Sequence, residues 1–320
     1  MTLRLRIDER AFRSHVKSVA DATPHLVPVV KGNGYGLGRT KLLELVAELL
    51  PDTTTVAVGT IHEAADVPEK FAAHVMTPVG ELDEVEIPAN AMLTVGSQRD
   101  VDVLARRGWK GRVIVKLASS MRRFGATQND FPLLVQDVVR IGGVIHACSI
   151  HSPTAGSDEA RLAEVRAWLP IIPECVTVSV SHLAPASLHA LRTLSDRRTV
   201  EARMGTALWH GTKEHFTLSA DVQRVEVCRA GETAGYRATR IEHDGHLLVI
   251  GAGTAHGVAP LANGDSPFHF GRVRIPLVES PYMHNALAVV SAGDPLPNAG
   301  DLVDVQRPLT LVSPDIVEWL

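Results

Sequence analysis

The hydrophobic and polar positions of the chain form two regions with different patterns. From residue 26 to about residue 205, short apolar runs of strand length alternate with charged segments of helical composition. We expect strands in eight runs: Leu26–Lys31, Thr54–Gly59, His74–Val79, Ala91–Gly96, Arg112–Leu117, Val144–His151, Val176–Ser181 and Val200–Gly205. We expect helices in the segments between them: Thr40–Leu50, Ile61–Val67, Leu82–Val85, Gln98–Arg107, Gln128–Ile141, Asp158–Leu169 and Pro185–Leu194. Eight such alternations predict a parallel (β/α)8 TIM-type barrel with the helices outside.

An open doubly wound sheet is the alternative to a closed barrel. An open sheet would gather its polar groups at one switch point, whereas a barrel presents them at the carboxyl ends of many strands. The chain places such groups at or just after the ends of five predicted strands: Lys31, Lys116 with Arg123, His151, His182, and Arg203 with Gly205. These groups converge only if the sheet closes, so the barrel fits the sequence better.

Beyond Lys213 the pattern changes to β-like stretches separated by Gly, Pro, Asn and Asp turns, which predicts an all-β second domain. These stretches are Phe216–Val227, Gly245–Ile250, Arg272–Val278, Leu287–Val290 and Leu302–Val305. At the other end of the chain, Thr2–Ile7 alternates apolar and charged residues and is expected to join this domain as a strand. Asp8 is the expected N-cap of a helix that runs to about residue 22. The predicted domains are therefore 8–213 (barrel) and 214–320 (β domain).

Composition and charge narrow the functional classes. The 320 residues are 45% hydrophobic with a net charge of −4, which allows a large core and gives no reason to expect nucleic acid or anionic lipid as a partner. The three cysteines, Cys148, Cys175 and Cys228, are scattered, which excludes a zinc ribbon or disulfide framework. We find neither a signal peptide nor a membrane-spanning run. We therefore expect a soluble cytoplasmic protein without a bound metal.

The most informative stretch is His25–Gly38, HLVPVVKGNGYGLG, in which Lys31 follows a short β-branched run and precedes a glycine-dense turn. The glycine spacing is not that of a Rossmann turn, and a P-loop lysine would follow the glycines instead of preceding them. A lysine with its stem buried at a strand end would have a lowered pKa, which an amine needs to attack an aldehyde. A purely structural turn is the alternative.

The sequence VVKGNGYGLG resembles the cofactor-lysine motif of the alanine racemase family, usually VVKANAYGHG. The resemblance implies that Lys31 holds pyridoxal 5'-phosphate as a Schiff base and that Tyr35 contacts its phosphate. It also implies a homodimer whose active sites are shared between two chains.

Further matches extend the resemblance along the barrel. VKLASSMRRFG at 115–125 is similar to the family's LKxDTGMxRLG, which implies that Lys116 can be carbamylated and that Arg123 binds the substrate carboxylate. His151 matches a histidine beside the cofactor ring. His182 matches the next strand's cofactor-site histidine, but Pro185-Ala186 replaces the family's phosphate-binding Asn-Ser, so that Ser187 could substitute only if the turn shifts.

EARMGTALW at 201–209 resembles the family segment whose arginine faces the pyridine nitrogen. This match implies that Arg203 takes that position and that Gly205 and Thr206 offer backbone N–H groups to the phosphate. A guanidinium does not give up its proton, so the ring would be a weaker electron sink than one paired with a carboxylate.

The second domain departs from the family at its main catalytic position. VIGAGTA at 249–255 resembles IPIGYADG, but Ala252 stands where the family has its catalytic tyrosine. Any second base must come from elsewhere, and His256, His284 and Tyr282 are the candidates because they lie in the matching loops. Met283 matches a residue that caps the substrate carboxylate.

These observations predict an enzyme that uses pyridoxal phosphate to act on a small amino acid, as a racemase or epimerase with a relocated or missing second base. One-face chemistry, as in a decarboxylase, lyase or aldolase, is an alternative, because Ala252 cannot donate a proton. A non-catalytic pseudoenzyme that binds pyridoxal phosphate is the other.

Overall fold

The computed structural model describes residues 3–80, 85–195 and 197–320, and the chain divides into two compact units. The barrel unit consists of Ser14–Gly34 and Arg39–Trp209, and the β unit of the chain up to Arg13, Tyr35–Gly38 and His210–Leu320.

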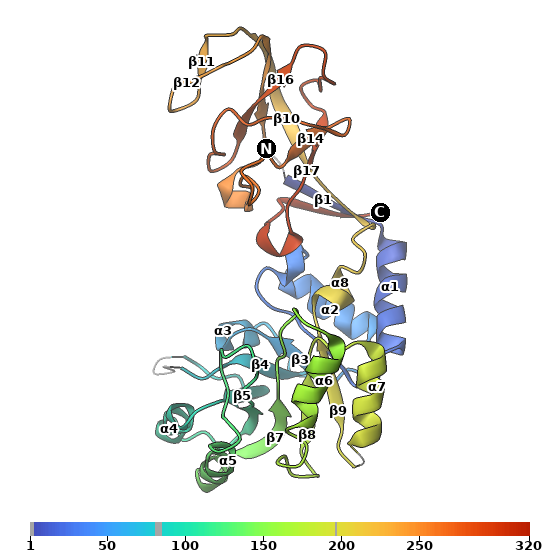
Figure 1. Ribbon diagram of the computed structural model, residues 1–320, viewed down its shortest axis with the longest axis vertical. Helices are drawn as coiled ribbons and strands as arrows, with labels where there is room; N and C mark the ends of the chain where they lie inside the picture. Colours follow the sequence, from blue (N-terminus) through green and yellow to red (C-terminus); the bar gives the residue numbers. More distant parts are fainter. Residues whose placement is uncertain (1–2, 81–84, 196) are drawn as a thin grey trace. The chain divides into compact units, whose positions relative to one another are not determined.

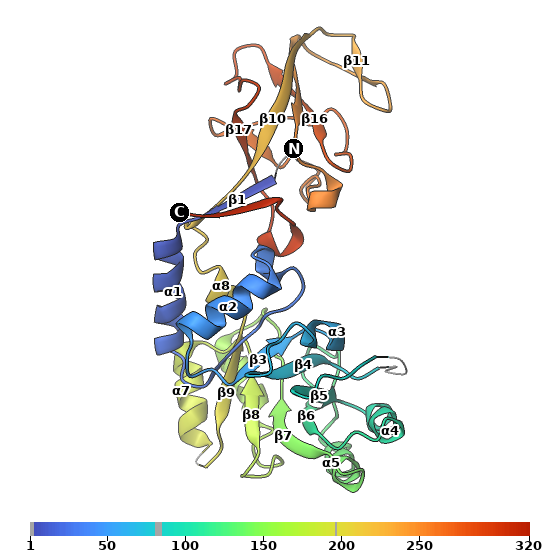
Figure 2. The same ribbon diagram turned by 180° about the vertical axis from the view of Figure 1, so that it is seen from behind.

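The barrel unit is built on a parallel sheet of eight strands within the described residues. They are β2 (Leu26–Pro28), β3 (Thr55–Val58), β4 (Ala72–Pro78), β5 (Ala91–Val95), β6 (Arg112–Lys116), β7 (Val144–Ser149), β8 (Thr177–Val180) and β9 (Val200–Met204). Their order is β2-β9-β8-β7-β6-β5-β4-β3, and Figure 2 shows β3 to β9 following one another around the barrel. Each of the eight predicted strands is present.

Closure of the sheet depends on the first and last strands of this order. Val29, just after β2, forms a parallel bridge with Ala57 of β3, and Val30 N donates to Ala57 O at 2.7 Å. The other edge of β2 pairs with β9. The sheet therefore meets itself, which confirms the predicted barrel and excludes the open doubly wound sheet.

Helices cover the outside of the barrel, as Figure 1 shows for α6 and α7 beside β7–β9. The helices are α1 (Glu9–Asp21), α2 (Arg39–Leu49), α3 (Ile61–Ala64), α4 (Gln98–Arg106), α5 (Phe131–Arg140), α6 (Asp158–Arg166), α7 (Pro185–Leu194) and α8 (Thr206–Trp209). Asp8 Oδ1 accepts the Ala11 N–H at 2.9 Å, which confirms the predicted N-cap of α1. Most of the predicted helical segment Leu82–Val85 lies outside the described residues, and α8 was not predicted.

The β unit contains the strands of the second predicted region together with the N-terminal strand. The strands are β1 (Leu3–Ile7), β10 (Phe216–Cys228), β11 (Thr233–Ala234), β12 (Thr239–Arg240), β13 (Gly245–Ile250), β14 (Phe268–Phe270), β15 (Val273–Arg274), β16 (Ala286–Ser291), β17 (Leu302–Val305) and β18 (Ile316–Trp319). β1 lies between β10, to which it is antiparallel, and β18, to which it is parallel. Its alternate residues Leu3, Leu5 and Ile7 are fully buried, as the alternation predicts, while the predicted Thr2 lies outside the described residues.

No helix in the described parts of the chain is long and apolar enough to cross a membrane.

Candidate active site

The loop that follows β2 carries Lys31 to the carboxyl end of the barrel. The chain turns immediately after this residue, with Gly34 N donating to Lys31 O at 3.0 Å. Gly34 has a φ of +62°, and a Cβ at this position would lie 2.5 Å from the backbone nitrogen of Arg39. The turn therefore needs glycine here, because both the backbone conformation and the close approach exclude a side chain.

The Lys31 side chain is exposed, which corrects the expectation that its stem is buried among apolar neighbours. The pKa of its amine is nevertheless lowered from the ordinary lysine value. Desolvation by the surrounding protein is the largest cause, the positive charges of Arg123 and Arg203 add to it, and Glu63 opposes it. The amine is therefore open to a ligand and less protonated than a free lysine, which favours attack on an aldehyde.

A layer of polar side chains crosses the barrel strands on the face that carries Arg203. The strand register pairs Lys116 with Ser149, Ser149 with Ser179, and Ser179 with Glu201. Lys116 is only 6% exposed, and its Nζ lies 3.4 Å from Ser149 Oγ. Arg203, two residues beyond Glu201, donates from Nη1 to Ser179 Oγ at 2.7 Å. This layer places two basic side chains within the barrel.

Burial changes the charge of these two groups differently. Burial, with help from the charges of Arg203 and Arg123, lowers the pKa of Lys116 to about 6, so its amine is mostly neutral at pH 7. Burial also lowers the pKa of Arg203 to about 10, opposed by Glu201, and the guanidinium stays protonated at neutral pH. The pair therefore combines a neutral amine with a permanent cation.

Replacing Lys116 by Met should stabilise the protein and flatten the pH dependence of its unfolding. The folded-state pKa, about 6, lies below the ordinary value of 10.5, so between these pH values the unfolded chain binds a proton that the folded chain does not. The parent's free energy of unfolding should therefore rise with pH across this window. Removing the amine should add roughly 4–5 kcal/mol at pH 7, because pH 7 lies about 3.5 units below the pKa of the unfolded amine.

Urea unfolding between pH 6 and pH 10 (roughly the window in which the two states differ in bound protons) measures this effect. The buffers should be free of CO₂, because a neutral amine also reacts with it. Lys110→Met is the matched control, since Lys110 is exposed. A Lys116→Met protein with the parent's pH slope would show that the buried amine does not titrate as described.

Two histidines lie just after the ends of neighbouring barrel strands, His151 after β7 and His182 after β8. His151 and His182 have ring centroids 4.6 Å apart. Burial, aided chiefly by Arg203 and Lys116, lowers the pKa of His151 to about 3, so this ring is neutral, and its Nδ1 is 2.6 Å from the Ser181 hydroxyl. His182 Nδ1 donates to Ser152 O at 2.8 Å, which fixes the orientation of its ring. Both rings are therefore held in defined orientations.

The start of α8 lies close to the strand that leads to Lys31. Val29 N donates to Met204 O at 2.8 Å, and the Trp209 indole N–H donates to Val29 O at 2.8 Å. These two bonds bracket Gly205, which precedes α8, and Thr206, the first residue of α8. Because the first N–H groups of a helix have no partner within it, this turn can accept an anionic group near Lys31.

Ser187 and Tyr35 each contact a residue of their own unit. The Ser187 hydroxyl, on α7, hydrogen-bonds the Asp158 carboxylate, which also accepts the Ala184 N–H at 2.9 Å. Tyr35 belongs to the β unit, where it is buried and its ring meets His210 edge-on at 5.6 Å. His210 Nε2 donates to Tyr35 O at 2.7 Å.

The predicted residues of the β unit lie on two loops that are hydrogen-bonded to each other. Thr254 N donates to Tyr282 O at 2.7 Å, and Ala255 N donates to Met283 O at 2.8 Å. Ala252, at the position of the family's tyrosine, is fully buried. The loops therefore form one surface on which a replacement base can be sought.

His256 has both ring nitrogens engaged. Nδ1 accepts the Gly253 N–H at 3.0 Å, so Nε2 carries the proton and donates to Asp315 Oδ2 at 3.1 Å. Asp315 also accepts the Leu3 N–H at 2.9 Å. With 6% exposure and no free lone pair, His256 holds the loop to neighbouring segments and is poorly suited to take up a substrate proton.

His284 and Met283 are exposed on the same surface. Met283 is 66% exposed, and the His284 ring, also exposed, lies 5.8 Å from that of His256. The Tyr282 hydroxyl donates to Glu279, and desolvation together with this bond raises the pKa of Tyr282 to about 12. Of the three candidate bases, His284 has the ring most accessible to a ligand.

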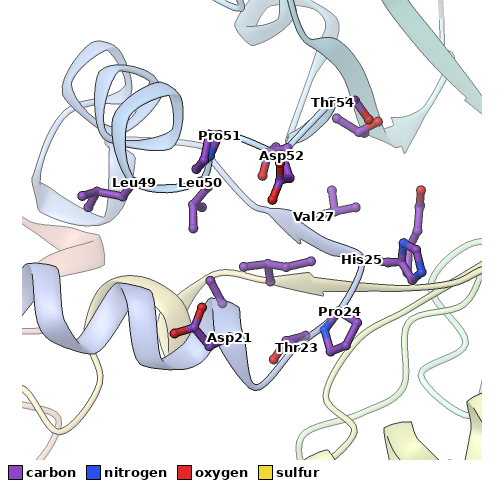
Figure 3. Close-up of a pocket in the computed structure, with 15 residues that line it drawn as sticks. Asp21, Thr23, Pro24, His25, Val27, Leu49, Leu50, Pro51, Asp52 and Thr54 are labelled. Carbon is purple, nitrogen blue, oxygen red and sulfur yellow. The ribbon is translucent and has the colours of Figure 1, made fainter.

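A cavity of about 440 Å³ opens at the other end of the barrel (Figure 3). It is lined by residues at the amino ends of the strands, among them His25, Thr54 and Asp52. The reactive and charged side chains described above lie at the carboxyl ends of the strands, so this cavity is separate from the Lys31 mouth. No group of three or more potential metal ligands occurs in the described parts of the chain.

The electrostatic couplings show which predicted residues the fold brings together. Lys31, Lys116 and His151 all respond to the charges of Arg123 and Arg203, so these groups share one mouth. Tyr35, His256, Met283 and His284 belong to the β unit. Sequence reasoning missed Glu63, because an acid at the start of a short helix has no distinguishing pattern.

A family model described as alanine racemase, N-terminal domain, matches residues 7–213, which include the whole barrel sheet. The chain belongs to the alanine racemase family. No curated protein matches the sequence of this chain.

Several solved alanine racemases share its fold over essentially the full chain. The enzyme from Bartonella henselae, described with covalently bound pyridoxal phosphate, has a TM-score of 0.77 and 19% identity, covering 100% of both chains. The biosynthetic enzyme from Pseudomonas aeruginosa has a TM-score of 0.73 and 20% identity, covering 100% of this chain and 99% of that one. At these identities the likeness shows that the family member has the alanine racemase fold, with its C-terminal all-β region.

Proposed function

We propose that this protein is a pyridoxal phosphate enzyme that acts at Cα of a small amino acid, with racemase-like inversion as the leading reaction. The observation that carries the proposal is the exposed Lys31 amine, with its lowered pKa, at a mouth lined by Arg123, Arg203 and the start of α8. When bound, pyridoxal phosphate withdraws electrons from Cα of an amino acid and so acidifies its hydrogen.

The residues at the mouth suit this cofactor. Lys31 supplies the amine that attaches the aldehyde, and Gly205 and Thr206 supply N–H groups for the phosphate. Neutral His151 supplies a flat ring beside the cofactor, while Ser187, already bonded to Asp158, is a weaker candidate. We also assign Tyr35 and His182 to the proposed cofactor site, because the family motif implies this role for both residues.

Arg203 influences which reaction is favoured. Its guanidinium stays protonated, and bonds to Ser179 Oγ and Ile150 O fix its orientation. It can therefore donate a hydrogen bond to a ring nitrogen without transferring the proton. A brief removal and return of the Cα proton suits this arrangement better than chemistry that needs a long-lived carbanion.

The substrate and the two faces of Cα complete the proposal. Arg123 provides a planar fork for an amino-acid carboxylate, and Met283 caps the substrate. Lys116, once carbamylated as the family motif implies, would orient Arg123. Lys31 moves the proton on one face and His284 on the other, with His256 positioning the loop instead of acting as a base. We further propose a cytoplasmic homodimer, because His284 and Met283 belong to a surface that the family supplies from a second chain.

One-face chemistry is the second candidate function. Fully buried Ala252 offers no proton where the family has its tyrosine, so decarboxylation, elimination or aldol cleavage needs only Lys31. A pseudoenzyme that binds the cofactor without turnover is the non-enzymatic alternative.

Incubating the cofactor-loaded protein with L- and D-amino acids in D₂O separates these functions. We expect deuterium at Cα and loss of enantiomeric purity for small side chains such as alanine and serine, followed by NMR and chiral chromatography. Loss of CO₂ or release of an aldehyde would instead identify one-face chemistry. Tight cofactor binding without any exchange would identify a pseudoenzyme.

A further inference from the structure

A single carboxylate joins the loop of Lys31 to the neighbouring strand. Glu63, in α3, accepts the Gly32 N–H on Oε1 at 3.0 Å and the Gly59 N–H on Oε2 at 2.6 Å. The Gly32 N–H belongs to the peptide bond that follows Lys31, and Gly59 follows β3. Glu63 therefore ties the backbone of Lys31 to the end of the adjacent barrel strand.

The Glu63 hydrogen bonds hold the backbone at Gly32, which side-chain packing does not restrain. Gly32 has a φ of +59°, and no atom would lie within 4 Å of a Cβ there, so packing does not hold it. Its carbonyl accepts from Arg39 Nη1 at 2.7 Å, and Arg39 is itself paired with Asp66 at 2.6 Å. Both polar atoms of Gly32 are thus held by side chains, one of them through a carboxylate.

The negative charge of the same carboxylate also acts on the Lys31 amine and raises its pKa. Arg123, from the loop after β6, and Arg203, from β9, both disfavour a charged amine, whereas Glu63 favours it. Among the charged groups that act on Lys31, Glu63 is therefore the one that opposes the two arginines.

We propose that Glu63 is a positioning residue for Lys31: its carboxylate fixes the Lys31–Gly32 peptide and supplies the negative charge that offsets Arg123 and Arg203. This inference rests on the proposed function of Lys31 as the cofactor lysine. If Lys31 is the cofactor lysine, Glu63 would set both the orientation of its side chain and the protonation of its amine.

Glu63→Gln tests both parts on the protein without cofactor. The amide has the same shape, but it has no charge and only one accepting oxygen, so it keeps one of the two loop bonds. The pKa of Lys31 should fall by roughly 0.5–1 unit, because a nearby opposite charge is removed. It is measured from the pH dependence of Lys31 acetylation by limiting acetic anhydride, followed by mass spectrometry.

Hydrogen–deuterium exchange of the Gly32 and Gly59 amides gives the second measurement. Glu63→Gln should speed exchange at one of the two amides by roughly tenfold or more, as expected when a hydrogen bond to a charged group is lost. Glu63→Asp keeps the charge on a shorter side chain, so exchange should rise while the pKa of Lys31 stays near that of the parent. Glu44→Gln, an exposed acid on α2, is the charge-matched control and should change neither quantity.

The inference is overturned if Glu63→Gln leaves the Lys31 pKa and both amide exchange rates at the parent values. It is also overturned if Glu44→Gln lowers the pKa of Lys31 as much, since general charge would then be the cause. Because neither measurement uses the cofactor, failure of the parent to bind pyridoxal phosphate would contradict the proposed function alone.

Discussion

Lys31→Ala should eliminate covalent attachment of pyridoxal phosphate and lower turnover by roughly 10³-fold or more, because one side chain both holds the cofactor and moves a proton. Borohydride reduction of the loaded parent should leave the cofactor on the peptide that contains Lys31. The variant should release all cofactor on denaturation, as measured by intact-protein mass spectrometry.

Lys116 is the competitor that makes this experiment informative. With a pKa lowered to about 6, its amine is mostly neutral at pH 7 and is chemically capable of the same attack. It is 6% exposed, however, whereas Lys31 is exposed. We therefore expect access to decide in favour of Lys31, and a reduced adduct mapped to Lys116 would contradict this assignment. Lys110→Ala, a change of an exposed lysine, controls for removal of a positive charge.

His284→Ala should abolish inversion of configuration while Cα exchange continues for one enantiomer. The reason is that Lys31 can still remove and return a proton on its own face, but no group remains to do so on the other. We expect inversion to fall by roughly 10²-fold or more, in line with the loss of a general acid–base. Deuterium incorporation, measured separately with the L- and D-forms of the best substrate, reports each face.

His256→Ala is the matched control for this variant. His256 is buried and makes two hydrogen bonds through its ring, so its loss should lower the free energy of unfolding by roughly 2–3 kcal/mol. It should affect the two enantiomers equally, since it acts through the loop. If His256→Ala removes exchange of one enantiomer selectively, or if His284→Ala still inverts, the roles given to these two histidines are wrong.

Local features of this chain were readable from its sequence because they depend on neighbouring residues. The apolar runs gave the positions of all eight barrel strands, and Asp8 was recognisable as a cap because capping involves a residue only three positions away. The same strand pattern placed Lys31, Lys116, His151 and Arg203 at strand ends, and the family resemblance identified the motif around Lys31.

Long-range packing decided the features that the sequence left open or misplaced. Closure by the Val29–Ala57 bridge joins residues 28 positions apart, and the exposure of Lys31 depends on the whole mouth. The hydrogen bonds that revised the predicted roles also join residues far apart in the sequence. They link Ser187 to Asp158, His256 to Asp315, and Glu63 to Gly32. The sequence thus determined the barrel strands and the chemical types at their ends. Only the tertiary structure decided which polar atoms remain available, because a hydrogen-bond partner is set by distance in space and not by distance along the chain.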